Sequence, residues 1–330
     1  MPLSEFELIE RLFTRRGGGR PDVRQGIGDD GAVLVPPPDQ DLVAAVDTLV
    51  AGVHFPLQTE SSDIGHKALA VNLSDLAAMG ALPAWYTLAL TVPEADPAWL
   101  EGFAAGLSAL AGRYGMELVG GDTTRGPLSV TVQAHGFVPR GQALYRRGAQ
   151  AGDLIYVTGE LGGAGLALRS LQGGITLSPQ VHDDVMQRLN RPEPRFEEGR
   201  VLLNIANAAI DISDGLVSDL GRMLKAGAAG ATVQTERVPV SAPVRALLPP
   251  AGDQDPGLAL ALTAGDDYEL CFTVAEGRRA QLDEAMDRLG RPCTCIGVVE
   301  AAPGLRWRMG DGGQYTPPKG GYDHFAGQGG

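Results

Sequence analysis

The chain has 330 residues, of which 44% are hydrophobic and 20% charged, and its formal net charge is −13. This composition provides enough apolar material for folded cores and excludes a disordered chain, and the length fits two medium domains better than one. The acidic balance matches nucleic acid and anionic membranes poorly, so neither is expected as a partner.

The predicted elements of the first 140 residues alternate between strand and helix. The patterns predict helices over 5–15, 63–79 and 98–114, and strands over 32–35, 42–47, 85–92, 117–119 and 129–138. Asp47 falls at the end of a predicted strand, and Asp63 is the predicted N-cap of the second helix. In that helix Asn72 and Asp75 share one face.

A polar, glycine-bearing segment over 141–152 is predicted to cross to a second domain. Beyond it, helices are expected up to residue 171 and over 181–190, 196–208, 215–226 and 276–289, with strands over 154–157, 231–234, 258–263, 270–274 and 294–299 and an irregular tail over 310–330. The expected organisation is an N-terminal domain over 1–140, the crossing segment, and a C-terminal domain over 153–330. The expected fold class is therefore α/β, in an α+β two-domain arrangement.

The turn over 158–165 is rich in glycine and stands between a predicted strand and a predicted helix. Such a turn can hold phosphate with its backbone N–H groups. It matches neither the Walker A pattern nor the dinucleotide fingerprint, and close packing of a helix on a strand explains such glycines equally well.

The cysteines, the first residues and the lengths of the apolar stretches indicate the cellular compartment. Cys271, Cys293 and Cys295 form neither a disulfide framework nor a zinc-binding spacing. The first residues carry acids and no long apolar run, which is atypical of a signal peptide, and no stretch reaches the ~20 apolar residues of a membrane span. We therefore expect a soluble, cytoplasmic protein.

The most informative pattern is a set of eight aspartates in apolar or glycine-rich surroundings. They are Asp29, Asp30, Asp47, Asp75, Asp122, Asp214, Asp266 and Asp267, and almost no Lys or Arg lies within three residues of them. A carboxylate in such surroundings is costly to bury without a positive partner. The set therefore predicts Mg²⁺, which carboxylates often bind together with phosphate. Asp before Gly is also a common turn residue, but Asp47 and Asp75 do not occupy turn positions.

Other candidate residues have ordinary structural alternatives. His54 stands in apolar company, where a histidine is more often a packed residue than a ligand. Arg146 and Arg147 in the crossing segment could clamp phosphate or remain a solvated basic pair. Tyr322, in the glycine-rich tail, could close over a ring-shaped ligand or simply anchor the C-terminus. No nucleophile elbow or zinc-protease motif is present.

Several sequence blocks together resemble the thiamine-monophosphate kinase family. They are residues 26–30, 47–55, 67–80, 120–126, 210–216, 265–270 and 321–325, in this order along nearly the whole chain. Single blocks also resemble the wider superfamily of aminoimidazole ribonucleotide synthetase and selenophosphate synthetase. The combination of the long helical block with the Tyr-Asp-His-Phe tail is similar to the kinases specifically.

The resemblance implies ATP-dependent phosphorylation of thiamine monophosphate to thiamine diphosphate, with direct transfer of the γ-phosphoryl group. It implies two α/β domains, with N-terminal domains paired in a homodimer and an active site between domains. It also implies several Mg²⁺ ions with ATP as co-substrate, and K⁺ is a further candidate cofactor.

The resemblance also implies site residues, position by position. Metal ligands would be Asp30, Asp47, Asp75, Asp122, Asp211 and Asp214; ATP contacts would be Gly121, Asp122, Arg146 and Ser213; contacts to the thiamine substrate would be His54, Asp266 and Tyr322. No residue would act as a nucleophile.

Two positions depart from the family pattern. The family often has Ser-Thr where this chain has Ala45 and Val46, so metal contacts there would run through backbone carbonyls or water. The family commonly has Glu at the position of Asp266, whose carboxylate reaches about one methylene less. Three other functions remain open on the sequence: a sister ATP-dependent synthetase, a Mg²⁺-dependent phosphatase, and a non-catalytic sensor of thiamine phosphates.

Overall fold

The computed structural model describes residues 12–13, 19–252, 254–318 and 320 of the chain. The chain divides into two compact units, Met1–Ala143 and Leu144–Gly330, which are described separately. The helix predicted over 5–15 lies outside the described residues except for Leu12 and Phe13, both buried. Tyr322 also lies outside them.

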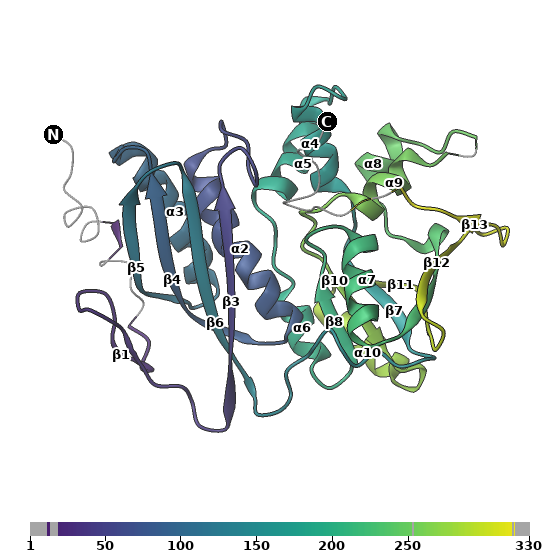
Figure 1. Ribbon diagram of the computed structural model, residues 1–330, viewed down its shortest axis with the longest axis horizontal. Coiled ribbons are helices and arrows are strands. Elements are labelled where there is room, and N and C mark those ends of the chain that lie inside the picture. The colour runs from purple at the N-terminus through teal and green to yellow at the C-terminus, as the bar shows by residue number, and fades with distance from the viewer. Residues whose placement is uncertain (1–11, 14–18, 253, 319, 321–330) are drawn as a thin grey trace. The chain divides into compact units, whose positions relative to one another are not determined.

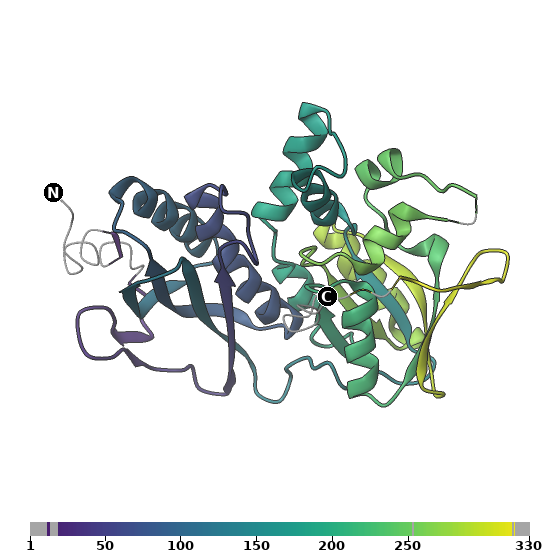
Figure 2. The ribbon, with the colours of Figure 1, turned by 45° about the horizontal axis from the view of Figure 1, so that its top comes forward.

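The first unit is a four-stranded sheet with two long helices. Its elements are β1 (Val23–Gln25), β2 (Val33–Leu34), β3 (Gln40–Val50), α2 (Ser61–Ala78), β4 (Leu82–Val92), α3 (Pro97–Arg113), β5 (Glu117–Arg125) and β6 (Ser129–Pro139). The strand order of the sheet is β3-β6-β4-β5, and β1 and β2 form a separate ribbon. Both helices cover one face of the sheet (Figures 1 and 2).

Glycines allow the two helices to pack closely. A Cβ at Gly65 of α2 would stand 2.1 Å from the Phe103 backbone oxygen, and one at Gly106 of α3 would stand 1.8 Å from that of Ser62. Only glycine permits this approach of backbone to backbone. The tight pair shields the sheet face on which β3 and β6 contact α2.

Three boundaries in this unit differ from the sequence prediction. β3 continues to Val50, so Asp47 lies inside the strand and not at its end. β5 continues through the Gly-Gly-Asp block to Arg125, because it pairs with β4 along its whole length. The N-cap position of α2 belongs to Glu60, so Asp63 sits in the first turn of the helix instead.

The second unit is a seven-stranded sheet with helices. Its strands are β7 (Leu154–Thr158), β8 (Ala208–Asp211), β9 (Gly230–Gln234), β10 (Leu270–Val274), β11 (Cys293–Glu300), β12 (Gly304–Arg308) and β13 (Gln314–Tyr315). Its helices are α4 (Gly163–Leu171), α5 (Pro179–Asn190), α6 (Phe196–Leu202), α7 (Leu216–Ala226), α8 (Ala242–Leu247), α9 (Pro256–Thr263) and α10 (Arg279–Leu289), with short 3-10 turns at Thr235–Arg237 and Glu276–Arg278.

The strand order of this sheet is β13-β12-β9-β11-β7-β10-β8. Helix α7 packs on the sheet through Leu216, Leu220 and Met223, which share one core with Ile155 and Ile210. The central strands β7 and β10 are buried along nearly all their length, as their continuous apolar runs require. This packing fixes the end of β8, where Asp211 stands.

Two elements of this unit contradict the sequence prediction. Residues 258–263 form helix α9 and not a strand, because Pro256 starts the helix and Asp255 caps it by accepting the N–H of Leu258 at 2.8 Å. The helix predicted over 196–208 ends at Leu202, and Ala208–Asp211 forms the edge strand β8. The tail is not wholly irregular, since Gln314–Tyr315 pairs with β12.

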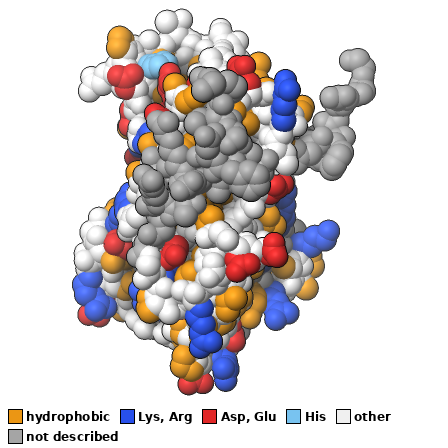
Figure 3. Space-filling model, turned by 90° about the vertical axis from the view of Figure 1, so that its left-hand side faces the viewer, with side chains coloured by type: hydrophobic (Ala, Val, Ile, Leu, Met, Phe, Trp, Pro, Cys, Tyr) orange, Lys and Arg blue, Asp and Glu red, His pale blue; other side chains and the backbone are white. Residues whose placement is uncertain are grey.

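The surface and the thiols agree with the composition. On the face seen in Figure 3, acidic and basic side chains are interspersed among the described residues. All three cysteines are free thiols. Within the described part of the chain, no helix has both the length and the apolarity needed to cross a membrane.

Candidate functional site

In the first unit, Asp47 and Asp122 lie on opposite edges of one sheet. Asp47 is on β3 and Asp122 on β5, with β6 and β4 between them. Three strand spacings separate the two edges by about 14 Å. One metal ion therefore cannot bind both carboxylates of the same chain.

The two aspartates also face opposite sides of that sheet. Asp47 lies on the same side of β3 as the buried Val43 and Leu49, because side chains two residues apart share a face. It therefore points to the face that α2 covers. Asp122 belongs to the row Thr48–Thr131–Ala89–Asp122, whose members are exposed or half-buried. Gly121, directly before it, is exposed, and a Cβ there would stand 1.9 Å from the Leu88 carbonyl oxygen.

Helix α2 carries Asp75 in an otherwise buried stretch. Asp75 is half-buried, whereas Asn72, one turn earlier, is fully buried and donates its side-chain N–H to the Ala68 carbonyl at 3.1 Å. The Asn72 Oδ1 atom has no hydrogen-bond partner among the described residues. A buried polar atom of this kind usually binds water or a ligand.

His54 lies in a tight loop after β3. Its Nδ1 atom accepts the backbone N–H of Val50 at 2.9 Å, which leaves Nε2 as the protonated nitrogen of the neutral ring. The ammonium of Lys67, only 3% exposed, donates to the His54 carbonyl at 3.4 Å. A buried lysine of α2 thus supports the loop that presents His54.

The remaining candidates of this unit are at its surface. Asp30 is exposed in a turn where its N–H donates to Asp29 Oδ1 at 2.8 Å. Ala45 is half-buried on β3, and Val46 is 60% exposed. Because strand side chains alternate, the Val46 side chain points away from the face of Asp47.

In the second unit, Asp211 ends strand β8 and is 4% exposed. The turn that follows places Ser213 and Asp214 directly before helix α7. Gly215 has φ 104°, and a Cβ there would stand 2.9 Å from the Ala264 carbonyl oxygen. Glycine is therefore required at this point, and it holds the Ser213–Asp214 turn against the segment that follows α9.

An arginine meets the carboxylates of this turn. Arg222 of α7 forms ion pairs with Asp214 and with Asp219, the latter at 2.8 Å. Asp219 in turn accepts the N–H of Asp214 at 2.9 Å. The scarcity of Lys and Arg near these acids in the sequence is therefore misleading at Asp214, because about two turns of helix bring Arg222 back to it.

Asp219 is buried, with a side chain that is 1% exposed. Burial raises the pKa of Asp219 to about 7, and the Asp211 and Asp214 carboxylates add to the rise against the lowering effect of the Asp214 N–H and of Arg222. The Asp211 and Asp214 carboxylates against one guanidinium thus leave an excess of negative charge at the end of β8, even where Asp219 is protonated.

The segment Gly265–Tyr268 lies alongside the Ser213–Asp214 turn. The N–H of Asp266 donates to the Ser213 carbonyl at 2.9 Å, and the N–H of Tyr268 donates to that of Ile212 at 2.9 Å. Three residues proposed from the sequence, Asp211, Ser213 and Asp266, therefore occupy neighbouring backbone segments. Arg146 is exposed, while the guanidinium of Arg147 lies 4.9 Å from the centre of the Tyr145 ring.

The glycine-rich turn before α4 is already capped by a carboxylate. Both Asp267 oxygens lie 3.0 Å from the N–H of Gly162, the N-cap residue of α4. Burial raises the pKa of Asp267 well above its usual value, and the nearby Glu269 and Asp266 add to this. Close packing explains the glycines, since a Cβ at Gly165 would stand 2.4 Å from that of Ala264. The packing interpretation, and not a phosphate cradle, fits this turn.

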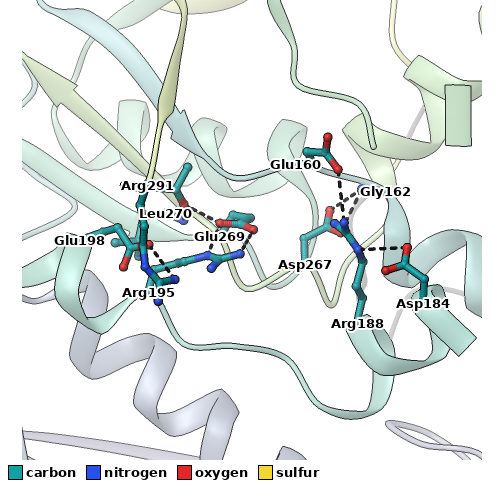
Figure 4. A network of polar contacts seen from close by, with 11 residues as sticks. Glu160, Gly162, Asp184, Arg188, Arg195, Glu198, Asp267, Glu269, Leu270 and Arg291 are labelled. Atoms are coloured by element: carbon teal, nitrogen blue, oxygen red, sulfur yellow. Dashed lines mark hydrogen bonds and ion pairs between the residues drawn. The ribbon is translucent and has the colours of Figure 1, made fainter. Parts of the chain in front are cut away.

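A buried ion pair anchors the other end of the Asp266 segment (Figure 4). The Glu269 side chain is 3% exposed, forms a two-pronged ion pair with Arg195, and accepts the Thr158 hydroxyl at 2.6 Å. Burial alone would lower the pKa of Arg195, but the Glu269 carboxylate outweighs it and raises this pKa.

A cavity of about 370 Å³ adjoins this network. It is lined by Gly159, Glu160, Gln187, Arg188, Arg191, Pro192, Glu193, Arg195, Asp267 and Glu269. Several of its charges are matched within the protein: Arg195 by Glu269, and Arg188 by Glu160 at 3.3 Å. The positive and negative charges of the lining therefore largely cancel, which does not favour an anion site.

The carboxylates fit Mg²⁺ only if the protein supplies part of the ion's coordination shell. Within the described residues, no three His, Cys, Asp or Glu side chains form a group that could hold a metal ion. Mg²⁺ typically takes one or two protein carboxylates and completes its shell with water and phosphate oxygens. The excess negative charge near Asp211 and Asp214 suits an ion of this kind.

Four residues of these networks escaped the sequence analysis: Lys67, Arg195, Asp219 and Glu269. Lys67 and Glu269 stand within the sequence blocks but carry no local signal of burial. Arg195 follows two prolines in Arg-Pro-Glu-Pro-Arg, a pattern without a periodic signature. Their partners are brought close only by the fold.

Comparison with known proteins places the chain in a family. Residues 28–138 match the model of AIR synthase related protein, N-terminal domain, and residues 150–309 match that of its C-terminal domain. Thiamine-monophosphate kinase of Salmonella typhimurium is 50% identical over 328 residues, which cover 99% of each chain. The chain belongs to the thiamine-monophosphate kinase family.

Solved structures agree with this family assignment. Thiamine-monophosphate kinase from Stenotrophomonas maltophilia is 46% identical, with a TM-score of 0.85 over 96% of this chain and 99% of that one. AaThiL complexed with AMPPCP and TMP is 30% identical, with a TM-score of 0.76 over 98% of this chain and 97% of that one. The two-domain α/β fold expected from the sequence is confirmed.

Proposed function

We propose that this chain transfers the γ-phosphoryl group of ATP to thiamine monophosphate and so forms thiamine diphosphate and ADP. The observation that carries the proposal is the 50% identity to a thiamine-monophosphate kinase over the full chain. The family member solved with AMPPCP, a β,γ-methylene analogue of ATP, and TMP supports both substrates.

The transfer is direct and in line. A phosphate oxygen of thiamine monophosphate attacks the γ-phosphorus, the new O–P bond forms, and the bond to the β-phosphate oxygen breaks with ADP as leaving group. The attacking oxygen is already an anion at neutral pH, because the second pKa of a phosphomonoester is about 6, so no general base is needed. Catalysis then consists of positioning and electrostatic stabilisation.

Residues of this chain would share the work of positioning. Gly121, Asp122, Arg146 and Ser213 would bind ATP. His54, Asp266 and Tyr322 would bind the thiamine substrate, with the Asp266 carboxylate toward its cationic thiazolium ring. The Asp266 N–H donates to the Ser213 carbonyl at 2.9 Å, so the segment proposed to bind the thiamine substrate contacts a segment proposed to bind ATP.

Mg²⁺ would be held by Asp30, Asp47, Asp75, Asp122, Asp211 and Asp214, with backbone contributions from Ala45 and Val46. It would neutralise the charge that accumulates on the phosphate oxygens. A requirement for K⁺ belongs to the same proposal and is tested by replacing K⁺ with Na⁺ in the assay.

We also propose that two copies of the chain pair through their first units as a homodimer. Leu42 and Val46, 49% and 60% exposed on the face not covered by α2, provide apolar surface for pairing. Light scattering tests this: full activity of a monomeric species would contradict it.

We also propose that the protein works in the cytoplasm, where ATP is available and the three free thiols stay reduced. Cell fractionation with an activity assay tests this location.

The decisive experiment is an ADP-release assay with Mg·ATP and thiamine monophosphate, with the product identified by chromatography. Thiamine diphosphate formed one-to-one with ADP is expected. Folded protein that releases no ADP above the control without substrate would refute the kinase. Phosphate released from thiamine monophosphate without ATP would indicate a phosphatase instead.

A further inference from the structure

The segment that carries Asp266 has an unusual backbone. Asp266 and Tyr268 both have positive φ angles, 65° and 49°. A left-handed conformation is disfavoured for residues with a Cβ, and a bulky residue such as tyrosine adopts it less readily than aspartate. Such a conformation persists only where the surroundings impose it, and it is found preferentially at functional sites.

The surroundings impose it from both ends. Beyond the two backbone bonds to Ser213 and Ile212, the N–H of Ile212 donates to the Glu269 carbonyl at 2.8 Å. The Glu269 side chain is fixed by Arg195, and the Asp267 carboxylate is fixed on the N–H of Gly162. Every residue from Asp266 to Glu269 therefore has a fixed backbone or side-chain contact.

This backbone brings the Tyr268 hydroxyl to Asp266. Tyr268 is 8% exposed, and its O–H donates to Asp266 Oδ1 at 3.0 Å. The acceptor is a carboxylate, so the bond is charge-assisted and stronger than one between neutral groups. It spans only two residues of a rigid segment, so it orients the Asp266 carboxylate and contributes little to the rest of the fold.

We propose that Tyr268 is a positioning residue for Asp266: its hydroxyl fixes the orientation of the carboxylate that meets the thiazolium cation of the substrate. The inference rests on the proposed function, in which Asp266 binds the thiamine substrate. It explains why a tyrosine is held in a costly left-handed conformation, since the conformation serves to direct its hydroxyl at the neighbouring acid.

The test is Tyr268→Phe, which removes the hydroxyl and keeps the buried ring. The KM for thiamine monophosphate should rise about tenfold, as expected for losing a hydrogen bond to a charged group that is partly solvated. The kcat and the KM for ATP should stay within about twofold. A structural defect would instead change both KM values and lower the Tm.

Tyr156→Phe is the matched control. Tyr156 is also buried in this unit, at 3% exposure, but its hydroxyl has no hydrogen-bond partner within the described part of the chain. Removing it should leave the KM for thiamine monophosphate unchanged.

A double-mutant cycle shows whether Tyr268 acts through Asp266. Asp266→Asn should itself raise the KM for thiamine monophosphate, and adding Tyr268→Phe to that variant should raise it no further. An equal rise in both backgrounds, or an unchanged KM in Tyr268→Phe alone, would overturn the positioning role.

The outcomes separate this inference from the function on which it rests. Wild-type protein that forms no thiamine diphosphate would refute the kinase and the positioning role together. Normal wild-type turnover with no effect of Tyr268→Phe would refute the positioning role alone.

Discussion

Acidic residues at and beside the candidate sites of the two units are held in different ways. In the second unit they are fixed by charge: Asp214 pairs with Arg222, Asp267 caps a helix, and Glu269 pairs with Arg195. In the first unit, Asp30 and Asp122 are exposed on a turn and on the open face of a sheet. The comparison indicates that an aspartate in the second unit can serve the fold, whereas the exposed acids of the first unit are available for ligands.

This difference gives the two groups different expected mutant phenotypes. An exposed carboxylate on a strand makes little contribution to stability, so its replacement should affect turnover alone. Replacement of a buried, paired residue should first affect folding. The predictions below test this separation, beginning with the largest effect.

The largest effect is expected for Asp122→Asn. If Asp122 binds metal at the transferring phosphate, loss of its charge should lower kcat by about 10³-fold or more. The free energy of unfolding should change by less than about 0.5 kcal/mol, because the side chain is exposed. ADP release and urea unfolding measure the two quantities. Full turnover in this variant would remove Asp122 from the metal ligands.

Arg195→Met should have the opposite profile. It leaves Glu269, whose side chain is 3% exposed, as an unpaired buried carboxylate, which should cost about 3 kcal/mol in the free energy of unfolding. Arg188→Met is the matched control, since Arg188 and Glu160 are 37% and 43% exposed and such a pair contributes less than about 1 kcal/mol. Urea unfolding in which both variants lose the same stability would contradict the contrast.

The sequence predicted the long periodic elements best. α2, α3, β4 and β6 extend over 11 residues or more, and their periodicity survives local exceptions. Helix α9 was misread as a strand because an apolar run of eight residues shows neither period clearly. Strand β8 was missed because its four buried residues follow a helical pattern without a break.

The candidate site was predictable only as a set of residues. The motifs single out Asp211, Ser213 and Asp266, but nothing local indicates that the Asp266 N–H donates to the Ser213 carbonyl. Likewise, Arg222 lies eight residues beyond Asp214 and pairs with it only because α7 starts between them. The opposite edges of Asp47 and Asp122 follow from strand order and their opposite faces from strand register, neither of which a single motif specifies.

A smaller effect of pH is expected from the first unit. Burial lowers the pKa of His135, which lies on β6 next to Trp85 of β4, although a hydrogen bond with the Trp85 backbone partly offsets this. Below the unfolded-state pKa of about 6.5, the unfolded chain binds a proton that the folded protein does not, so stability falls as pH decreases toward the lowered folded-state pKa.

His135→Gln should remove this contribution. Its free energy of unfolding should depend less on pH between 7 and 5 than that of the wild type, as measured by urea unfolding at several pH values. His182→Gln, which replaces a histidine exposed on α5, is the control for the loss of an imidazole as such. Parallel curves for the wild type and His135→Gln would show that His135 is not the group responsible.

The smallest effect is expected for Val46→Thr, which introduces the hydroxyl group common in the family. Val46 is 60% exposed and points away from the face of Asp47, so its side chain cannot reach a metal ion bound by that carboxylate within one chain. The Mg²⁺ concentration for half-maximal turnover should therefore stay within about twofold. A clear drop in that concentration would mean that the residue meets a metal ion on the open face of the sheet, which in the proposed dimer is also the face of Asp122. Such a result would show that a metal ion bound at β3 lies on the open face of the sheet and not on the face of Asp47.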